Sequence, residues 1–187
     1  EFHAATINTF SIDGSAGDDS VTVHGTDLDD TGSSIGLTGA LHSSDYHVST
    51  AGFESTTFVG GGGNDYTQVY GSLLDDTFYS LPQEAKLTTP DSQHIMLGFE
   101  RVDGYGRGGN DYGSLYGTLG DDLYISRDRF TLIKGDGHMG YTKGFERIDS
   151  FGRGGNDVAE LHGTTGDDKF ISTDKYAALI TEFRITY

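Results

Sequence analysis

GGGGNDYTQVYGSLLDDTFY (residues 60–79) and GRGGNDYGSLYGTLGDDLYI (residues 106–125) are two copies of one pattern, 46 residues apart. In each copy, two glycine-rich acidic turns enclose a short strand-like run. The tetrapeptide GGND ends at Asp65, Asp111 and Asp157, and AGDD ends 46 residues before the first of these, at Asp19. A fixed period of this length is typical of tandem-repeat architectures.

The repeat extends over the chain, which we treat as a single repeat domain, 1–187. The second turn recurs as GTDLDD (25–30), GSLLDD (71–76), GTLGDD (117–122) and GTTGDD (163–168), and GFE recurs at 52–54, 98–100 and 144–146. Between 98–122 and 144–168, 17 of 25 positions are identical. We therefore divide the chain into four copies, 6–51, 52–97, 98–143 and 144–187. The first copy, which lacks GFE, is the most divergent.

Short runs between the turns predict an all-β fold, because no window carries apolar residues at sustained helical spacing. In the third copy the expected strands are Phe99–Tyr105, Tyr112–Tyr116, Leu123–Ser126, Phe130–Lys134 and Met139–Lys143.

Two all-β architectures are compatible with this pattern. In a β-solenoid (a β-helix or β-roll), each copy would supply two rungs of about 23 residues, and equivalent side chains would stack along the axis. Such stacking predicts one internal ladder from Val23, Val69, Leu115 and Leu161. The alternative is a four-bladed β-propeller with one copy per blade. The strands hold few large aliphatic residues for blade packing, which favours the solenoid.

The turns have the composition of a calcium site. Successive glycines allow backbone carbonyls to turn toward one point, and Asp and Asn add side-chain oxygens, so the turns offer the mixed oxygen ligands that Ca²⁺ prefers. The aspartates of AGDD and GGND, together with the adjacent pair that ends each second turn, are 13 of the 29 acidic residues, and stacked carboxylates repel one another without a counter-ion. The candidate metal ligands are Asp18, Asp19, Asp29, Asp30, Gly63, Asn64, Asp65, Asp75, Asp76, Gly109, Asn110, Asp111, Asp121, Asp122, Gly155, Asn156, Asp157, Asp167 and Asp168. The alternative interpretation is that GND and GDD are ordinary turns, which need no metal.

The quoted segments resemble the bacterial RTX family, also called haemolysin-type calcium-binding repeats, whose nonapeptide reads G-G-x-G-x-D-x-U-x. Asp65, Asp111 and Asp157 match the motif aspartate, Asp19 matches it less closely, and the second-turn residues Asp76, Asp122 and Asp168 match it again. The resemblance implies a parallel β-roll, secretion and calcium-triggered folding outside the cell. The layout departs from the family, because the two motif aspartates of a copy lie 11 residues apart rather than 9. The pattern also resembles repeat arrays of large bacterial surface proteins, which implies a structural or adhesive role.

The formal net charge of −17 makes nucleic acid and anionic membranes unfavourable partners, since both need clustered Lys and Arg. There is no cysteine, no apolar run of membrane-spanning length and no visible signal peptide. We expect a secreted or cell-surface segment, with neighbouring repeats of a longer parent chain as partners and no insertion into a membrane.

Catalysis is not predicted. The sequence holds no cysteine nucleophile, no G-x-S-x-G and no HExxH. The prominent acids recur at the same position of each copy, whereas a catalytic site needs different groups around one centre. The chain is therefore predicted to be a non-enzyme and a structural or adhesive segment that binds calcium. The alternatives are a carbohydrate-binding module, or a non-catalytic repeat attached to a polysaccharide-modifying enzyme.

Two side-chain patterns bear on these alternatives. Arg101 and Arg147 stand two residues before an aspartate, and a ladder of salt bridges is favoured over a ligand-binding row of guanidinium groups. Tyr70 and Tyr116 share one repeat position with two histidines, and an exposed tyrosine row would indicate binding of a glycan or of another surface protein. Packing of these rings between rungs would indicate a spacer instead.

Overall fold

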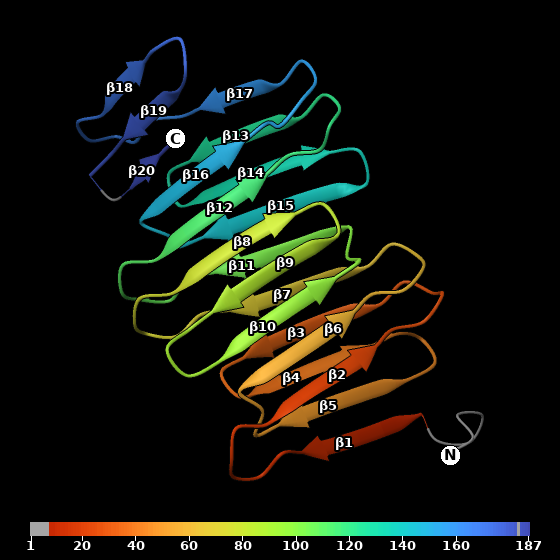
Figure 1. Ribbon diagram of the computed structural model, residues 1–187. Coiled ribbons are helices and arrows are strands. Elements are labelled where there is room, and N and C mark those ends of the chain that lie inside the picture. The colour runs from red at the N-terminus through yellow and green to blue at the C-terminus, as the bar shows by residue number, and fades with distance from the viewer. Residues whose placement is uncertain (1–7, 183) are drawn as a thin grey trace.

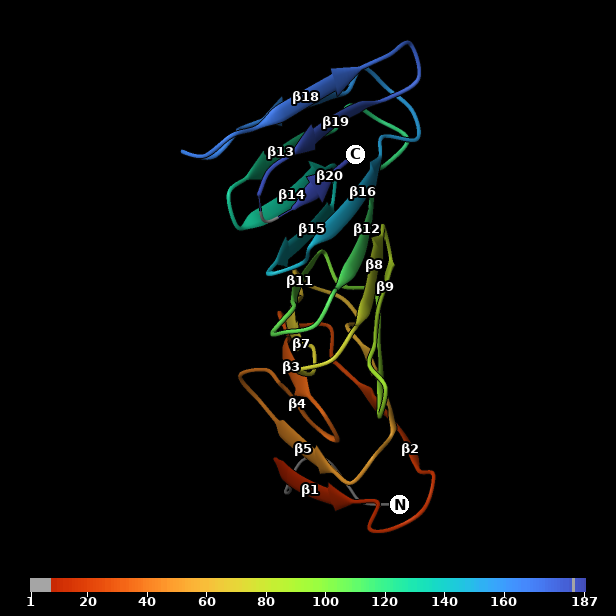
Figure 2. The ribbon, with the colours of Figure 1, turned by 90° about the vertical axis from the view of Figure 1, so that its left-hand side faces the viewer.

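The computed structural model describes residues 8–182 and 184–187 and shows an all-β solenoid over this part of the chain. Two ten-stranded sheets face each other along the molecule (Figures 1 and 2). This architecture confirms the expected solenoid and excludes the propeller, because the sheets extend along an axis instead of forming blades around one. Over the described residues, no helix long and apolar enough to cross a lipid bilayer is present.

The strands are β1 (Thr9–Asp13), β2 (Ser20–His24), β3 (Thr31–Ile35), β4 (Thr38–His42), β5 (His47–Ala51), β6 (Ser55–Val59), β7 (Tyr66–Tyr70), β8 (Thr77–Leu81), β9 (Glu84–Thr88), β10 (Gln93–Leu97), β11 (Arg101–Tyr105), β12 (Tyr112–Tyr116), β13 (Leu123–Arg127), β14 (Phe130–Gly135), β15 (His138–Lys143), β16 (Arg147–Phe151), β17 (Val158–Leu161), β18 (Lys169–Ser172), β19 (Ala177–Ile180) and β20 (Ile185–Thr186). The five strands expected in the third copy are present as β11 to β15, with small differences at their ends.

The strand order shows how one copy is built. Sheet A has the order β1-β5-β4-β3-β7-β11-β15-β14-β13-β17, and sheet B has the order β18-β19-β20-β16-β12-β8-β9-β10-β6-β2. Each copy therefore places its first strand in one sheet, its second strand in the other, and a three-stranded antiparallel meander back in the first sheet.

The chain enters a sheet three times in each copy, and this makes one and a half turns of the solenoid. Successive copies therefore start on opposite sheets. The expectation of two rungs per copy, with equivalent residues stacked in one ladder, is therefore wrong. Val23 and Leu115 lie in sheet B, whereas Val69 and Leu161 lie in sheet A. Equivalent residues of consecutive copies do not stack because the chain enters a sheet an odd number of times in each copy.

Paired residues are 35 positions apart where a strand pairs in parallel with a strand of the next copy, as in Ser20–Ser55 and Thr31–Tyr66. The separation is 38 where the last strand of a meander pairs with the first strand of its own copy, as in Arg101–Met139. The first strand of each meander pairs in parallel with the second strand of the next copy. The meanders thus join consecutive copies.

The core is a thin layer between the sheets. Alternate side chains point inward, and the fully buried ones include Phe58, Phe78, Leu115 and Ile148. Inward positions also carry small hydroxyl residues, among them Thr67, Ser80 and Ser126. A chain with only 34% hydrophobic residues can fill this thin layer, because each rung contributes only a few core side chains.

Candidate functional site: two edges of stacked acidic turns

The predicted site residues lie along the two long edges of the solenoid, where the chain passes from one sheet to the other (Figure 1). The edge that leads from sheet B to sheet A carries the turns 25–30, 60–65, 98–100, 117–122 and 152–157. The opposite edge carries 14–19, 52–54, 71–76, 106–111, 144–146 and 163–168. Equivalent turns of consecutive copies therefore lie on opposite edges.

Each stack of turns combines three different motifs from three consecutive copies. The Asp30 amide donates to Asp65 Oδ1 at 2.8 Å, and the Asp65 amide donates to Glu100 Oε2 at 2.7 Å. The other edge repeats this arrangement in a series of three acids, Asp76, Asp111 and Glu146, with distances of 2.9 and 2.7 Å. We call these two sets the acidic columns.

The glutamates of GFE belong to the columns, although they were not among the predicted site residues. Glu54 accepts the Asp19 amide at 2.8 Å, as Glu100 and Glu146 accept the amides of the GGND aspartates. The signal was present in the sequence as a separation of 35 residues from each aspartate to its glutamate. It was hidden because the obvious period is 46.

In the second turn of the first three copies, the first of the two adjacent aspartates also links two rungs. Asp29, Asp75 and Asp121 are exposed, and each accepts, through Oδ1, the backbone amide of an asparagine 35 residues later at 2.8 Å. Those asparagines (Asn64, Asn110, Asn156) are themselves exposed. Their backbone amides form the link to the neighbouring turn.

Hydrogen bonds inside the second turn satisfy much of its carboxylate. Asp122 Oδ2 accepts the Thr118 amide at 2.8 Å, and its Oδ1 accepts the Thr118 hydroxyl at 3.0 Å. The turns that end at Asp30, Asp76 and Asp168 have the same amide and hydroxyl bonds to the carboxylate. Carboxylates bonded in this way stabilise the turn without a metal ion, so these contacts favour the metal-free interpretation.

Two of the three GGND aspartates also hold an oxygen that is buried without a hydrogen bond, namely Oδ2 of Asp65 and Oδ2 of Asp111. Oδ2 of Asp19 in the AGDD turn and Oδ1 of Asp30 in the second turn are buried in the same way. Burial raises the pKa of Asp111 to about 7, and the neighbouring carboxylates of Asp76, Glu146 and Asp75 add to the shift. Burial likewise raises the pKa of Asp65. Buried, unsatisfied acids of this kind destabilise a fold unless a proton or cation neutralises them.

A backbone carbonyl lies near the free oxygen of Asp65 and near that of Asp111. A β-carbon on Gly106 would overlap both Asp111 Oδ2 and the carbonyl oxygen of Gly144, and one on Gly60 would overlap Asp65 Oδ2 and the Gly98 carbonyl. Close approach of the next rung therefore requires glycine here. It also brings a carboxylate and a carbonyl oxygen together, and hard cations bind such oxygens.

Side chains alone do not form a complete metal site. Within residues 8–182 and 184–187, no group of three or more His, Asp or Glu side chains is arranged to hold a metal ion. Any cation at the columns would therefore need backbone carbonyls or water as further ligands.

The remaining predicted residues lie at the margins of the columns. Gly63, Gly109 and Gly155 have φ angles of 104°, 101° and 88°, and they pass close to the backbone of the turn below. A group of acids is exposed to solvent, with no turn described above it on the C-terminal side: Asp157, Asp167 and Asp168. Asp18 is exposed near the N-terminal end.

Two buried histidines carry no predicted role. Burial lowers the pKa of His94 to about 4, and it lowers the pKa of His138 as well. Neither ring nitrogen of His138 has a hydrogen-bond partner in the described structure. Both side chains are therefore neutral near pH 7.

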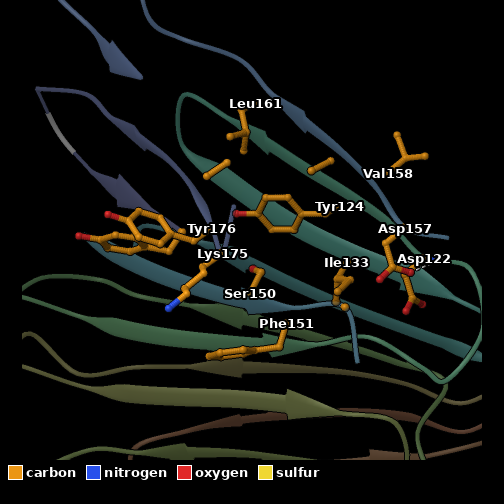
Figure 3. Close-up of a pocket in the computed structure, with 14 residues that line it drawn as sticks. Asp122, Tyr124, Ile133, Ser150, Phe151, Asp157, Val158, Leu161, Lys175 and Tyr176 are labelled. Atoms are coloured by element: carbon orange, nitrogen blue, oxygen red, sulfur yellow. Dashed lines mark hydrogen bonds between the residues drawn. The ribbon is translucent and has the colours of Figure 1, made fainter. Parts of the chain in front are cut away.

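A cavity of about 230 Å³ opens at the C-terminal end of the solenoid (Figure 3). Inward-facing core residues line it, among them Tyr124, Ile133, Leu161 and Ala177. It is the space between the sheets at the end where β17 and β18 are the last strands.

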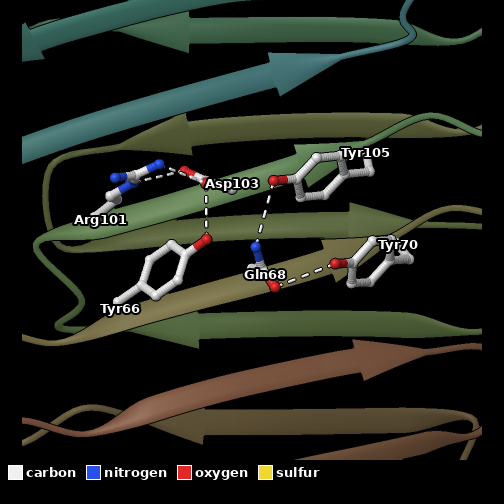
Figure 4. Close-up of polar contacts among 6 residues, drawn as sticks. All are labelled: Tyr66, Gln68, Tyr70, Arg101, Asp103 and Tyr105. Carbon is white, nitrogen blue, oxygen red and sulfur yellow. Dashed lines mark hydrogen bonds and ion pairs between the residues drawn. The ribbon is translucent and has the colours of Figure 1, made fainter.

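The outer face of sheet A carries a polar network (Figure 4). Arg101 donates through Nε and Nη2 to Asp103 at 2.9 and 2.8 Å, and the Tyr66 hydroxyl donates to the same carboxylate at 2.9 Å. Arg147 and Asp149 repeat the pair on sheet B. The predicted salt bridges are present, but the two arginines do not form one ladder because they lie on opposite sheets.

Tyrosines stack along the outer faces and cover one another. The rings of Tyr70 and Tyr105 lie 4.8 Å apart at an interplanar angle of 12°, and Tyr105 contacts Tyr141 in turn. Tyr116 stacks on Phe151 of sheet B in the same manner. Each of these rings has a neighbouring ring on at least one face, which reduces the flat aromatic surface open to a sugar.

Comparisons with protein-family models, with curated proteins and with solved structures found no match.

Proposed function

We propose that this chain is a non-catalytic structural segment of an extracellular bacterial protein, and that calcium stiffens it at the acidic columns. The observation that carries the proposal is the pair of buried aspartate oxygens, on Asp65 and Asp111, which no protein group satisfies. Each lies close to a glycine carbonyl of the next rung, so a divalent cation there would meet two protein oxygens of different type.

The scaffold itself supports a mechanical role. Rungs are joined by parallel ladders, by meanders that connect consecutive copies, and by amide-to-carboxylate bonds along both edges. Prominent acids repeat with the copies, and the outward tyrosines stack on neighbouring aromatic rings. These features favour a rigid spacer over an enzyme or a glycan-binding module. The resemblance of the turns to RTX repeats supports the extracellular bacterial setting.

Thermal unfolding with calcium and with EDTA tests the role of the cation. If calcium occupies the columns, it should raise the melting temperature by several degrees, because binding to the folded state alone adds to its stability. Magnesium at the same concentration is the control, because Mg²⁺ requires a compact octahedral set of ligands and binds poorly to flexible sites built from backbone carbonyls.

Asp111→Asn should lower the calcium stoichiometry measured by titration calorimetry. Asp157→Asn is the matched variant, because both aspartates close the hexapeptide GRGGND but only Asp111 lies between two rungs. A melting temperature that is indifferent to calcium, or an unchanged stoichiometry in Asp111→Asn, would contradict calcium binding at these turns.

A further inference from the structure

Within the part of the chain that the structure describes, the sheets end in unpaired edge strands at both ends of the solenoid. At the C-terminal end β17 is the last strand of sheet A and β18 the last strand of sheet B, and at the other end β1 and β2 occupy these positions (Figure 1). All other strands have a neighbour on each side. Open edges expose unpaired backbone groups and readily accept another strand.

The C-terminal end exposes side chains that are core residues elsewhere. Phe170 occupies the repeat position of Phe78 and Tyr124, which are 2% and 8% exposed, yet Phe170 is 61% exposed. The cavity between the sheets also opens at this end.

The N-terminal end exposes inward positions of the same kind. Ile12 occupies the repeat position of Phe58 and is 39% exposed, whereas Phe58 is 1% exposed. Phe10 and Val21 are only partly buried against the core. Each end therefore offers apolar side chains that a further rung would cover.

The outward backbone groups are known from the pairing of the inner strands. Val158 and His162 donate their amides to β13, so the amides of Ala159 and Leu161 between them point away from it. Inside the solenoid, the first strand of the next copy pairs with this edge. Its first amide donates to the carbonyl of the GGND aspartate, as the Arg101 amide does to the Asp65 carbonyl at 3.1 Å. Thr9 occupies the repeat position of Arg101 and could donate in the same way to the Asp157 carbonyl.

We propose that the two ends are complementary docking surfaces, and that a second copy of this chain adds head-to-tail to continue the solenoid. In this arrangement β1 of one molecule pairs in parallel with β17 of another, and β2 pairs with β18. The register of the inner strands places Thr9 opposite Val158 and Ser20 opposite Lys169.

Two features make a second copy the occupant rather than an unrelated extended peptide. β17 and β1 both belong to sheet A, and β18 and β2 both belong to sheet B, so both pairings can form at once. Each pairing already occurs three times inside the chain between the equivalent strands. A single peptide strand would complete only one of the two edges.

The contact is heterologous, so it does not close on itself and generates linear oligomers. The net charge of −17 opposes it, because each added molecule brings further negative charge. Association should therefore strengthen with ionic strength, as added salt screens this repulsion. Head-to-tail association does not depend on calcium. Measuring it in EDTA therefore distinguishes its failure from a failure of the proposed calcium binding.

Sedimentation velocity over a range of protein concentrations, in EDTA and moderate salt, tests the docking. The chain should form a concentration-dependent series of linear oligomers. Phe170→Glu at one end and Ile12→Glu at the other should each abolish the series. Leu73→Glu is the matched control, since Leu73 is 69% exposed on a lateral turn and the substitution adds the same charge. Circular dichroism checks that all three variants are folded.

Mixing the two end variants gives the sharpest result. Each retains one intact end, so the mixture should form a dimer and nothing longer. A chain that stays monomeric at all concentrations would overturn the proposal. So would an Ile12→Glu variant that associates like the unmodified chain, since that result would indicate contact between two C-terminal ends.

Disulfide trapping tests the register, because the chain has no native cysteine. Neighbouring strands lie about 4.8 Å apart, within the Cα separation that a disulfide spans. Thr9→Cys mixed with Val158→Cys should give a cross-linked dimer under mild oxidation, whereas Thr9→Cys mixed with Lys169→Cys should not. Equal cross-linking of both mixtures would contradict the register.

Discussion

The turn at 106–111 and the turn at 152–157 have the same sequence, GRGGND, and different surroundings. Asp111 is 1% exposed and lies between Asp76 and Glu146, whereas Asp157 has Asp122 on one side and is exposed. Identical local chemistry thus gives a buried acid with a raised pKa in one place and a solvated acid in the other. The neighbouring rung makes the difference, and three pairs of substitutions test how far this holds.

The largest difference is expected between Phe78→Ala and Phe170→Ala. Phe78 fills the interior, so its truncation should cost about 3–5 kcal/mol of unfolding free energy. Phe170 stands at the same repeat position but is largely exposed, so its truncation should cost no more than about 0.5 kcal/mol. Urea unfolding of dilute protein measures both. Similar losses would show that the C-terminal rung is covered in solution.

A smaller difference is expected between Gly106→Ala and Gly152→Ala. The added methyl group at Gly106 meets the backbone carbonyl of Gly144 as well as the Asp111 carboxylate, so a rung must shift, at a cost of about 1–3 kcal/mol. At Gly152 the nearest atoms are those of the Asp157 side chain, which can move at the open end. Its melting temperature should therefore fall by less. An equal fall in both variants would argue against close contact between rungs.

The smallest effect is a dependence on pH in the absence of calcium. The pKa of Asp111 rises on folding from its usual value to about 7, so its contribution favours the folded state at low pH and is lost as pH rises through 7. Asp111→Asn resembles the protonated form at every pH. In EDTA at pH 8 it should therefore melt about 2–6 °C above the unmodified chain, with solvent screening taken into account.

At pH 5 this advantage should be much smaller, and it should disappear only below the usual carboxyl pKa of 3.8, where Asp111 is protonated in both the folded and the unfolded state. The buried histidines act in the opposite direction, because their pKa values are lowered on folding, but they are common to both proteins and cancel in the difference. Asp157→Asn is the matched variant, because Asp157 closes the same hexapeptide but is exposed. A constant difference between pH 5 and pH 8 would contradict a raised pKa at Asp111.

The sequence predicted the strands and turns well because both depend on local chemistry. All five strands expected in the third copy formed, since Gly, Asn and Asp mark the turns and the runs between them alternate. The close approach of rungs at Gly106 could not be foreseen, because the atoms it avoids belong to residues 38 positions away.

The vertical neighbours were predicted wrongly. The period of 46 suggested that equivalent residues stack, but paired residues are 35 or 38 positions apart. The reason is that each meander folds back within one sheet, so the chain enters a sheet an odd number of times in each copy. Whether a strand remains in its sheet or crosses to the other depends on the short links inside the meander. Those links belong to the part of the repeat with the loosest sequence, so the repeat motifs gave no information about them.

Sequence by itself determined the all-β class, the four copies and the composition of the acidic turns, since repeats and turn residues act over short distances. Only the tertiary structure decided which turns lie on one edge, which aspartates are buried, and that the GFE glutamates join them. These properties depend on the rung above each turn, which comes from another copy. For the same reason, the two ends of the solenoid are the places where identical motifs remain uncovered.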